Sequence, residues 1–432
     1  MFLNHIPAML RILAVFIIIL YGIQKKLSLG SAFLIGSVVL GLLFAMNPWE
    51  ILQAVIASLL HPKTLALSAV VCLILVLSHS MEAAGQMKRL LDRFQGVVRH
   101  PGLKLIIFPA IIGLLPMPGG AIFSAPMVKD LGKRRGLSGA QLSYVNYWFR
   151  HIWEYWWPLY PGVLLTTTLA GLNLWVFVLC LFPVTVVATA AGYWPIREVL
   201  NRDESGAAGI RSKRTPVKPF LRELSPILTV IILGLGSGMI LTRLMAGNGE
   251  TISKELGLIL ALLVAIAWVW RSNHISGERR WSILRNPKLL HMFYMVAGIL
   301  IFQGILNQSG AVEAISRELI DWQIPLAPIT VLLPFIVGGV AGITIAFVGA
   351  TFPILISLVH TYGQGDLILS YMMLALVGGF AGVLLSPLHL CLLLSNGYFD
   401  TRLRPVYRYL WMPCLTLVAA AALYFLGLHA IK

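Results

Sequence analysis

The chain contains little charge and little cysteine for its length. Only 12% of its 432 residues are acidic or basic, whereas a soluble domain carries about a quarter. Hydrophobic residues make up 58% of the chain, so the composition excludes a soluble domain and predicts an all-α protein that crosses a membrane several times. The cysteines lie in apolar stretches without metal-binding or redox spacing, and we assign them to packing: Cys72, Cys180, Cys391 and Cys414.

Sequence motifs for catalysis and nucleotide binding are also missing. The chain has no His-Glu-x-x-His, no Walker loop, no Gly-x-Ser-x-Gly and no paired carboxylates within a span. We therefore expect no enzyme activity, no cofactor and no bound metal. Because energy from ATP would require another subunit, the economical interpretation is a permease driven by a sodium or proton gradient.

Ten apolar stretches are long enough to cross a bilayer, which takes roughly 17–25 helical residues. The first, Pro7–Ile23, is interpreted as a span and not as a cleaved signal peptide, because its positive charges follow the apolar run. The others are Leu27–Met46, Lys63–Ser80, Leu142–Leu172, Leu174–Trp194, Ser225–Met245, Ser253–Trp270, Lys288–Gln308, Leu367–Ser395 and Val406–Leu428.

The basic residues are distributed unevenly between alternate loops. The net charge of +16 would suggest a nucleic-acid partner in a soluble protein. Here, however, 26 Lys and Arg fall in the loops around residues 25, 88–135, 197–222, 271–288 and 402–408, six fall in the opposite loops, and Arg150 lies within a span. The positive-inside rule then predicts a multi-pass protein of the inner (plasma) membrane, with both termini outside and no nucleic-acid partner.

Landmarks of the first half recur in the second half at one constant shift. Pro62-Lys63, Gly85, Pro109 and Gly113 recur, in the same order and with the same gaps between them, as Pro287-Lys288, Gly310, Pro334 and Gly338. Each half holds five crossings, and an odd number reverses the second copy in the membrane. We predict two inverted repeats, residues 1–196 and 223–432, joined by a basic cytoplasmic linker at 197–222.

Between the third and fourth crossings of each half lies an interrupted apolar stretch. Residues 102–130 are broken by Pro116-Met117-Pro118-Gly119-Gly120, and residues 325–358 by Gly338-Gly339-Val340-Ala341-Gly342. Each piece is too short to cross alone, so we predict two re-entrant hairpins, with a pair of kinked full spans as the alternative. Irregular backbone at that depth must be buried in protein or line a wet cavity.

The crossing after each hairpin is also interrupted. Residues 142–172 contain Pro158 and Pro161, and residues 367–395 contain Gly378-Gly379, Gly382 and Ser386-Pro387. We predict a broken helix in both places. Helix N-termini exposed near the bilayer midplane attract anions, and unwound carbonyls can hold a cation, so the hairpin tips and the breaks together predict a binding site.

Both signs of charge occur inside the first broken helix. Arg150 and Glu154 are four residues apart and would share one helix face. Ionisable residues inside a span are costly and indicate function. We predict that Arg150 binds a carboxylate or other oxyanion and that Glu154 is its partner or a proton-coupled switch; an ion pair that only locks the helix is the alternative.

Further candidates lie beside the breaks. For substrate binding they are Gly119, Gly120, Ser124, Asn146, His151, Thr344 and Ser386, and for the coupling ion they are Gly342, Thr351 and His389 together with Glu154. Hydroxyls in spans also bond to their own helix, and His151 would equally suit packing. Gln303 and Asn307 are expected to bond between helices.

The chain resembles an uncharacterised family of prokaryotic integral membrane permeases. The resemblance covers nearly the whole chain and rests on three segments. They are Pro116-Met117-Pro118-Gly119-Gly120-Ala121, Asn146-Tyr147-Trp148-Phe149-Arg150-His151 followed by Glu154, and Ser386-Pro387-Leu388-His389-Leu390-Cys391. That family is similar to the ion transporter superfamily of gluconate, dicarboxylate, citrate and arsenite permeases. The resemblance implies a homodimer whose transport domain moves like an elevator against a scaffold domain, with sodium or protons as the coupling ion.

Neither hairpin carries the Ser-Asn-Thr type signature that dicarboxylate transporters of that superfamily have at their hairpin tips, so the resemblance assigns no site residue. The sequence as a whole predicts a secondary transporter of an anionic organic solute, with membrane lipids around it. The alternatives are a translocase of a lipid-linked phosphate, a membrane-embedded enzyme and, less favoured, a channel.

Overall fold

A computed structural model describes residues 6–94, 101–114, 116, 120–200, 217–244 and 253–430, and every regular element in those ranges is a helix. The prediction of an all-α protein is confirmed. In the first half, the helices are α1 (Ala8–Gln24), α2 (Leu29–Leu43), α3 (Pro48–Leu60), α4 (Pro62–Ala83), α5 (Gln86–Phe94), α6 (Pro101–Gly113), α7 (Ala121–Lys133), α8 (Gly139–His151), α9 (Pro161–Leu169), α10 (Leu174–Tyr193), η2 (Trp194–Ile196) and α11 (Arg197–Leu200).

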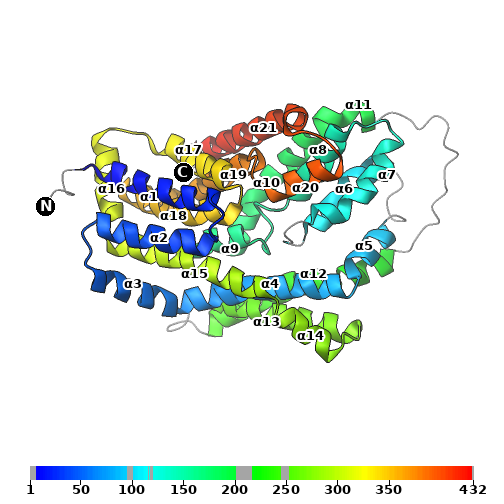
Figure 1. Cartoon of the computed structure of the whole chain (residues 1–432), viewed down its shortest axis with the longest axis horizontal. Coiled ribbons are helices and arrows are strands. Elements are labelled where there is room, and N and C mark those ends of the chain that lie inside the picture. Colours follow the sequence, from blue (N-terminus) through cyan, green and yellow to red (C-terminus); the bar gives the residue numbers. More distant parts are fainter. Residues whose placement is uncertain are drawn as a thin grey trace.

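The second half begins after the segment 201–216, which is outside the described residues. Its helices are α12 (Val217–Leu244), α13 (Ser253–Ser272), α14 (Gly277–Leu284), α15 (Pro287–Gln308), α16 (Ala311–Asp321), α17 (Leu326–Ala341), α18 (Thr344–Thr361), η3 (Gly365–Leu367), α19 (Ile368–Leu384), α20 (Leu390–Tyr398) and α21 (Leu403–Ala430). Figure 1 shows most of the long helices running roughly along the longest dimension of the molecule.

Within the described residues, seven helical stretches are long and apolar enough to cross a membrane, which supports a multi-pass membrane protein. The expected crossings at Pro7–Ile23 and Leu27–Met46 are shorter helices, α1 and α2, of 17 and 15 residues. The seven are Pro62–Ala83, Leu174–Ile196, Glu255–Ser272, Gly277–Gln308, Thr344–Thr361, Gly365–Leu384 and Leu403–Ala430.

One of these seven stretches, α18, is the second arm of the predicted second hairpin. It has 18 residues and is long enough to cross a membrane, whereas the sequence predicted a piece too short to cross. The helix is longer because it continues to Thr361 and ends only before Gly363, whose φ of 69° suits glycine.

Helix boundaries recur at the spacing of the sequence landmarks. α4 and α15 begin at the two copies of the Pro-Lys landmark, Pro62 and Pro287, and each runs 22 residues. α6 and α17 begin at Pro101 and Leu326, which are related by the same shift. Each of these two helices is followed by a second helix, then by two short or interrupted helices and one long helix. The order of elements from α4 to α10 therefore recurs from α15 to α21.

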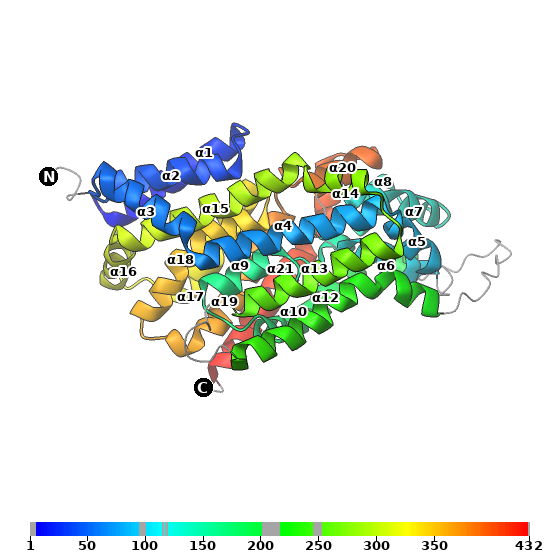
Figure 2. The ribbon, with the colours of Figure 1, turned by 90° about the horizontal axis from the view of Figure 1, so that it is seen from below.

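The described long helices pack in two groups. In the first group, α15 packs against α2, α3 and α4, and α13 packs against α4 and α12. In the second group, α17 packs against α18 and α19, α6 packs against α7 and α8, and α21 packs against α10 and α19. The two groups meet mainly where α15 contacts α18 and α4 contacts α9. Figure 2 shows α4 and α15 side by side along the first group.

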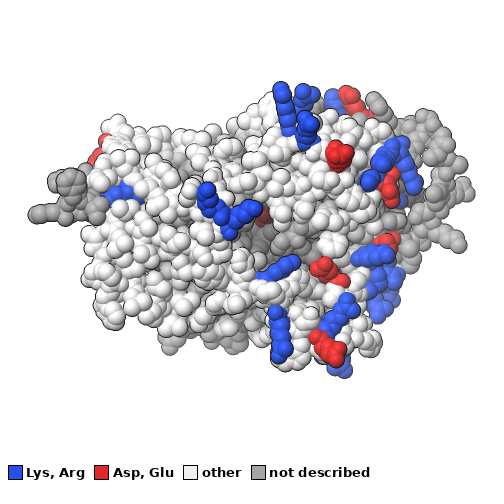
Figure 3. Space-filling model, viewed as in Figure 1, with Lys and Arg blue, Asp and Glu red and all other residues white. Residues whose placement is uncertain are grey.

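On one face of the molecule, basic side chains gather toward one end. On the face in Figure 3, most Lys and Arg lie on the half that carries α7 and α14, and few lie on the end that carries α1 and α16. The same face is hollowed near its middle. The linker predicted at 197–222 lies mostly outside the described residues, with α11 and the start of α12 at its two ends.

Candidate functional site

A cavity of about 330 Å³ lies between the two helix groups, and we call it the central cavity. The first group contributes Leu29 of α2 and one face of α15. The second group contributes the interrupted backbone. The lining residues from that backbone are Pro116, between α6 and α7; Arg150, His151 and Glu154, at the end of α8; Tyr160, Pro161 and Gly162, where α9 begins; Gly342, Ile343, Thr344 and Ile345, between α17 and α18; and Leu388, His389, Leu390 and Cys391, where α20 begins.

The first part of the first broken helix ends before Glu154, so Arg150 and Glu154 do not lie on the same helix. α8 ends at His151, and the chain turns before α9 begins at Pro161. Pro158 and Pro161 disfavour a continuous helix, because proline lacks the amide N–H and restricts the residue before it. Glu154 therefore lies in the turn after α8, and the prediction that it shares a helix face with Arg150 is wrong.

In the second half, the helices continue through several glycines at which the sequence predicted a break. α17 continues through Gly338 and Gly339 and ends at Gly342, whose φ of 66° is the left-handed conformation. α19 likewise continues through Gly378-Gly379 and Gly382, and the chain breaks only around Ser386-Pro387.

The glycines inside α19 do not break the helix; they allow α19 to pack closely against α17. A Cβ on Gly378 would lie 3.2 Å from Val331, and a Cβ on Gly382 would lie 2.9 Å from the carbonyl carbon of Phe335. Both neighbours belong to α17, so the two helices approach too closely for larger side chains.

Four helices of the described chain begin beside the central cavity: α7, α9, α18 and α20. Their N-cap residues are Gly120, Tyr160, Ile343 and His389, and none of these caps its helix with a side-chain hydrogen bond. The first amides of an uncapped helix have no partner within the helix, and the helix dipole adds positive potential there. The cavity is therefore electrostatically favourable for an anion.

Arg150 provides the full positive charge at this place. Its side chain is only 3% exposed. Nη1 lies 3.4 Å from His151 Nε2 and 3.5 Å from Cys391 Sγ. A Cβ on Gly120 would lie 3.0 Å from the Cζ atom of Arg150, so the backbone before α7 packs directly on the guanidinium.

Glu154 connects the first broken helix to the tip of the second hairpin. The hydroxyl of Thr344 donates a hydrogen bond of 2.6 Å to Glu154 Oε1. Glu154 Oε2 lies 3.7 Å from His151 Nε2. Because Thr344 is the first residue of α18, the carboxylate also lies at the positive end of that helix.

Two imidazoles extend this set of contacts to the second broken helix. His151 Nδ1 lies 2.6 Å from the carbonyl oxygen of Tyr147, to which it donates. Its Nε2 is therefore an acceptor in the neutral ring, and His389 Nε2 lies 3.2 Å from it. His389 Nδ1 is buried and has no hydrogen-bond partner among the described residues. The contacts thus run from His389 through His151 to Glu154.

The same cluster contains potential metal ligands. His151, His389 and Cys391 are buried, and their ligand atoms lie within 4.8 Å of one another, which suits a zinc ion. Arg150 Nη1, however, already contacts two of these atoms, so a divalent cation would face an adjacent positive charge. The guanidinium of Arg150 therefore disfavours a metal cation at these three ligand atoms.

Three predicted site residues lie away from the central cavity. Ser124 donates a 2.6 Å hydrogen bond to Asn146 Oδ1, and Asn146 Nδ2 donates to Ser395 at 2.9 Å, which links α7, α8 and α20. Thr351 donates to the carbonyl of Phe347 within its own helix. Their observed contacts are between or within helices.

Two more predicted residues complete the comparison. Ser386 is fully buried, and its hydroxyl accepts a hydrogen bond from the amide of Leu388, beside the turn at Gly342. Gly119 lies outside the described residues. The structure therefore brings Arg150, His151, Glu154, Gly342, Thr344 and His389 to one cavity, with Gly120 and Ser386 next to it.

Some cavity residues were missed in the sequence. Cys391 was assigned to packing, but it contacts Arg150; its position two residues after His389 was the available signal. Tyr160 donates a 2.6 Å hydrogen bond to the carbonyl of Gly113 and fixes the start of α9 against α6. His291, Met292 and Met295 line the cavity from α15, and no motif marked them.

The fold and the cavity define an α-helical, multi-pass membrane protein with a buried polar site where interrupted helices meet. The chain belongs to the family described as "Protein of unknown function (DUF401)", which matches residues 8–429. No curated protein shows significant similarity to this chain.

Proposed function

We propose that this protein is a secondary active transporter of a small anionic solute, an organic carboxylate, which binds in the central cavity. One observation carries the proposal: the buried guanidinium of Arg150 lies at a cavity where four uncapped helices begin. A guanidinium binds a carboxylate through two parallel hydrogen bonds. The volume of about 330 Å³ suits a small ligand.

Charge neutrality supports coupling to a cation. Arg150 and Glu154 together carry no net charge when both are ionised, so a bound mono-anion would leave one uncompensated negative charge. An uncompensated charge in a buried site costs several kcal/mol. A proton on Glu154 removes that cost. His151, which contacts Glu154, and His389, which contacts His151, supply proton-binding neighbours. Proton-driven symport is the favoured form, and sodium is the alternative coupling ion.

The packing of the chain supports alternating access by movement of one helix group against the other. The central cavity lies between the groups, and all its interrupted backbone belongs to the second group. We propose that this group carries the solute in an elevator-type movement, while the first group forms the scaffold and the interface of a homodimer. The recurrence of helix boundaries at one constant shift supports two inverted repeats.

The distribution of basic residues supports an orientation. The end with α7 and α14 carries most Lys and Arg in Figure 3, and by the positive-inside rule we propose that it faces the cytoplasm. The end with α3, α16 and the start of α4 then faces outward, with both termini outside.

A ligand screen tests the proposal. Purified full-length protein is heated with organic acids, inorganic oxyanions and lipid phosphates, and the same series is run on Arg150→Gln and on Arg134→Gln, which changes an exposed arginine. A carboxylate present at about 100 times its Kd stabilises by about 2.7 kcal/mol. We expect stabilisation of the wild type and of Arg134→Gln and its loss in Arg150→Gln.

Two results would contradict the proposal. Equal stabilisation of all three proteins by an organic acid would remove Arg150 from the site. Stabilisation by lipid phosphates alone would assign the cavity to a lipid-linked substrate instead of a soluble carboxylate.

A further inference from the structure

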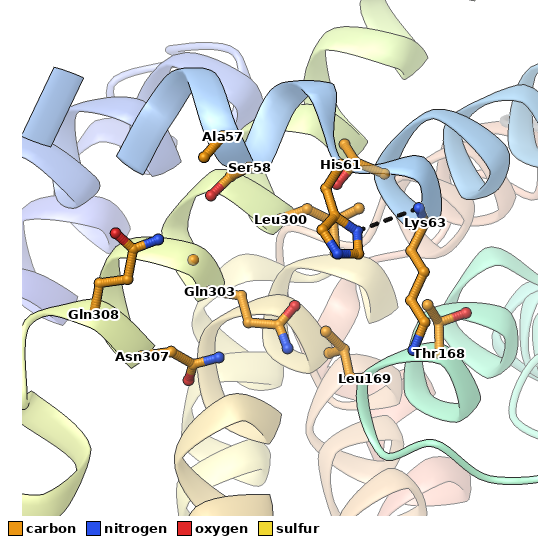
Figure 4. Close-up of a pocket in the computed structure, with 12 residues that line it drawn as sticks. Ala57, Ser58, His61, Lys63, Thr168, Leu169, Leu300, Gln303, Asn307 and Gln308 are labelled. Atoms are coloured by element: carbon orange, nitrogen blue, oxygen red, sulfur yellow. Dashed lines mark hydrogen bonds between the residues drawn. The ribbon is translucent and has the colours of Figure 1, made fainter. Parts of the chain in front are cut away.

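A second cavity, of about 350 Å³, lies between the same helix groups but near the end that carries α3 and α16, and we call it the outer cavity. Figure 4 shows its lining: Ser58 and His61 come from the junction of α3 and α4, Lys63 from the start of α4, Thr168 from α9, and Gln303, Asn307 and Gln308 from α15. His61 and Asn307 are exposed, so the cavity opens to the surface.

The lining of the outer cavity combines one cation with several hydrogen-bond donors. Lys63 extends toward Thr168, across the space that Gln303 and Asn307 face (Figure 4). Of the described residues that line the cavity, none is acidic. Within the described part of the chain, the ammonium of Lys63 has no ion pair and no hydrogen bond. A lone ammonium beside amide donors suits a carboxylate or another oxyanion.

The side-chain amides of Gln303 and Asn307, on α15, face the outer cavity and do not form the interhelical hydrogen bonds expected of them. Gln303 and Asn307 were predicted to bond between helices, but both line the outer cavity. In the described ranges, neither side-chain amide forms a hydrogen bond with protein. Their donors are therefore available to a ligand.

The equivalent positions at the other end of the molecule show a different charge balance. At the shift that relates the two repeats, Lys63 corresponds to Lys288 and Asn307 corresponds to Glu82. Glu82 and Lys288 both act electrostatically on His79, which lies 3.5 Å from Asn286. That end thus has a carboxylate to balance its lysine, whereas the outer cavity has an amide at the same position.

The two cavities are arranged along the same helices. On α15, Met295 lines the central cavity and Gln303 lines the outer cavity, and eight helical residues span about 12 Å. On α9, Gly162 and Thr168 line them in the same order. The outer cavity therefore lies between the surface and the central cavity, at the boundary between the two helix groups.

We propose that the outer cavity is a second anion-binding site, in which Lys63, Gln303 and Asn307 hold a small carboxylate or oxyanion between the outer surface and the central cavity. The inference rests on the proposed function for its route, but the binding of an anion at Lys63 is independent of transport.

Protection of Lys63 from chemical modification tests this site. Full-length protein in detergent is treated with an amine-modifying reagent, with succinate or sulfate present and with chloride as the ionic-strength control, and the rates at Lys63 and Lys288 are measured by mass spectrometry. At a concentration about twice its Kd, a bound anion slows modification of Lys63 about threefold by mass action. We expect that slowing at Lys63 but not at Lys288, and its loss in Asn307→Glu.

The Arg150→Gln protein separates this inference from the proposed function. If the outer cavity binds an anion by itself, Lys63 stays protected in Arg150→Gln although binding at the central cavity is lost. Protection that disappears with Arg150, or equal rates at Lys63 in succinate, sulfate and chloride, would overturn the second site. Neither result would decide whether the central cavity transports a carboxylate.

Discussion

In the proposed transport mechanism, Glu154 is the residue at which solute binding and ion coupling meet. It lies 3.7 Å from His151 and accepts a hydrogen bond from Thr344 at the tip of the second hairpin. When ionised, it compensates Arg150 and opposes a second negative charge nearby. When protonated, it no longer compensates the guanidinium, whose charge can then balance an anion. The proposed mechanism therefore links the binding of a proton and the binding of an anion through one carboxyl group.

Replacement of Glu154 by Gln makes this position permanently neutral. We expect Glu154→Gln to bind the anion with an affinity that no longer falls as pH rises, because no proton has to bind first. The protein should exchange solute across vesicles but should not accumulate it against a gradient. Uptake of labelled solute into proteoliposomes at several pH values measures both properties.

Glu313→Gln, which changes an exposed carboxylate of α16, is the matched control and should keep accumulation unchanged. Proton-driven accumulation by Glu154→Gln at the wild-type level would contradict the role of Glu154. Sodium-driven accumulation that survives the substitution would identify sodium as the coupling ion.

At the scale of elements, the second hairpin depends on one backbone conformation. Gly342 ends α17 with φ 66° and lets Thr344 begin α18 next to Glu154. A Cβ there would lie 2.9 Å from the hydroxyl oxygen of Ser386 and 3.1 Å from the amide of His389. The tip and the second broken helix therefore fit together only with glycine at this position.

Gly342→Ala should lower both stability and anion affinity. The left-handed conformation alone costs a non-glycine residue roughly 1–2 kcal/mol, and the close contacts add to this cost. Thermal unfolding and ligand stabilisation of the purified protein measure the two effects. Gly339→Ala, inside α17, meets only an ordinary contact at 3.7 Å and is the control. Equal behaviour of the two variants would show that the tip is not constrained.

The elements of the site were partly predictable from the sequence. Pro158 and Pro161 and the glycine run ending at Gly342 marked interruptions, because these residues act locally on the backbone. Polar residues beside interruptions in apolar segments were therefore assigned to one site, and Arg150 and His389 do line one cavity.

Other features depend on tertiary contacts that a single sequence does not show. Gly378 and Gly382 resembled a break, but they allow α19 to pack on α17. Cys391 resembled a packing residue in the sequence, but in the fold α20 brings its sulfur into contact with Arg150. Ser124 and Asn146 lie near the breaks in the sequence, yet their side chains point to each other. Local chemistry marked the interruptions, and helix packing determined which side chains line the central cavity.

At the scale of the whole molecule, the central cavity and the outer cavity both lie at the boundary between the two helix groups of the described residues. Both cavities are lined by α9 from the second group and α15 from the first. A relative movement of the groups would therefore change both cavities together. Figures 1 and 2 show α9 close to α4, where the two groups meet, in both views.

Solute uptake into proteoliposomes tests the central claim most directly. The carboxylate that stabilises the purified protein is supplied outside vesicles with an imposed pH or sodium gradient, and accumulation is followed for the wild type, Arg150→Gln and Arg134→Gln. We predict gradient-driven accumulation by the wild type and by Arg134→Gln, and background uptake by Arg150→Gln. Accumulation by Arg150→Gln at the wild-type rate, or no uptake by the wild type under either gradient, would contradict an anion transporter built around Arg150.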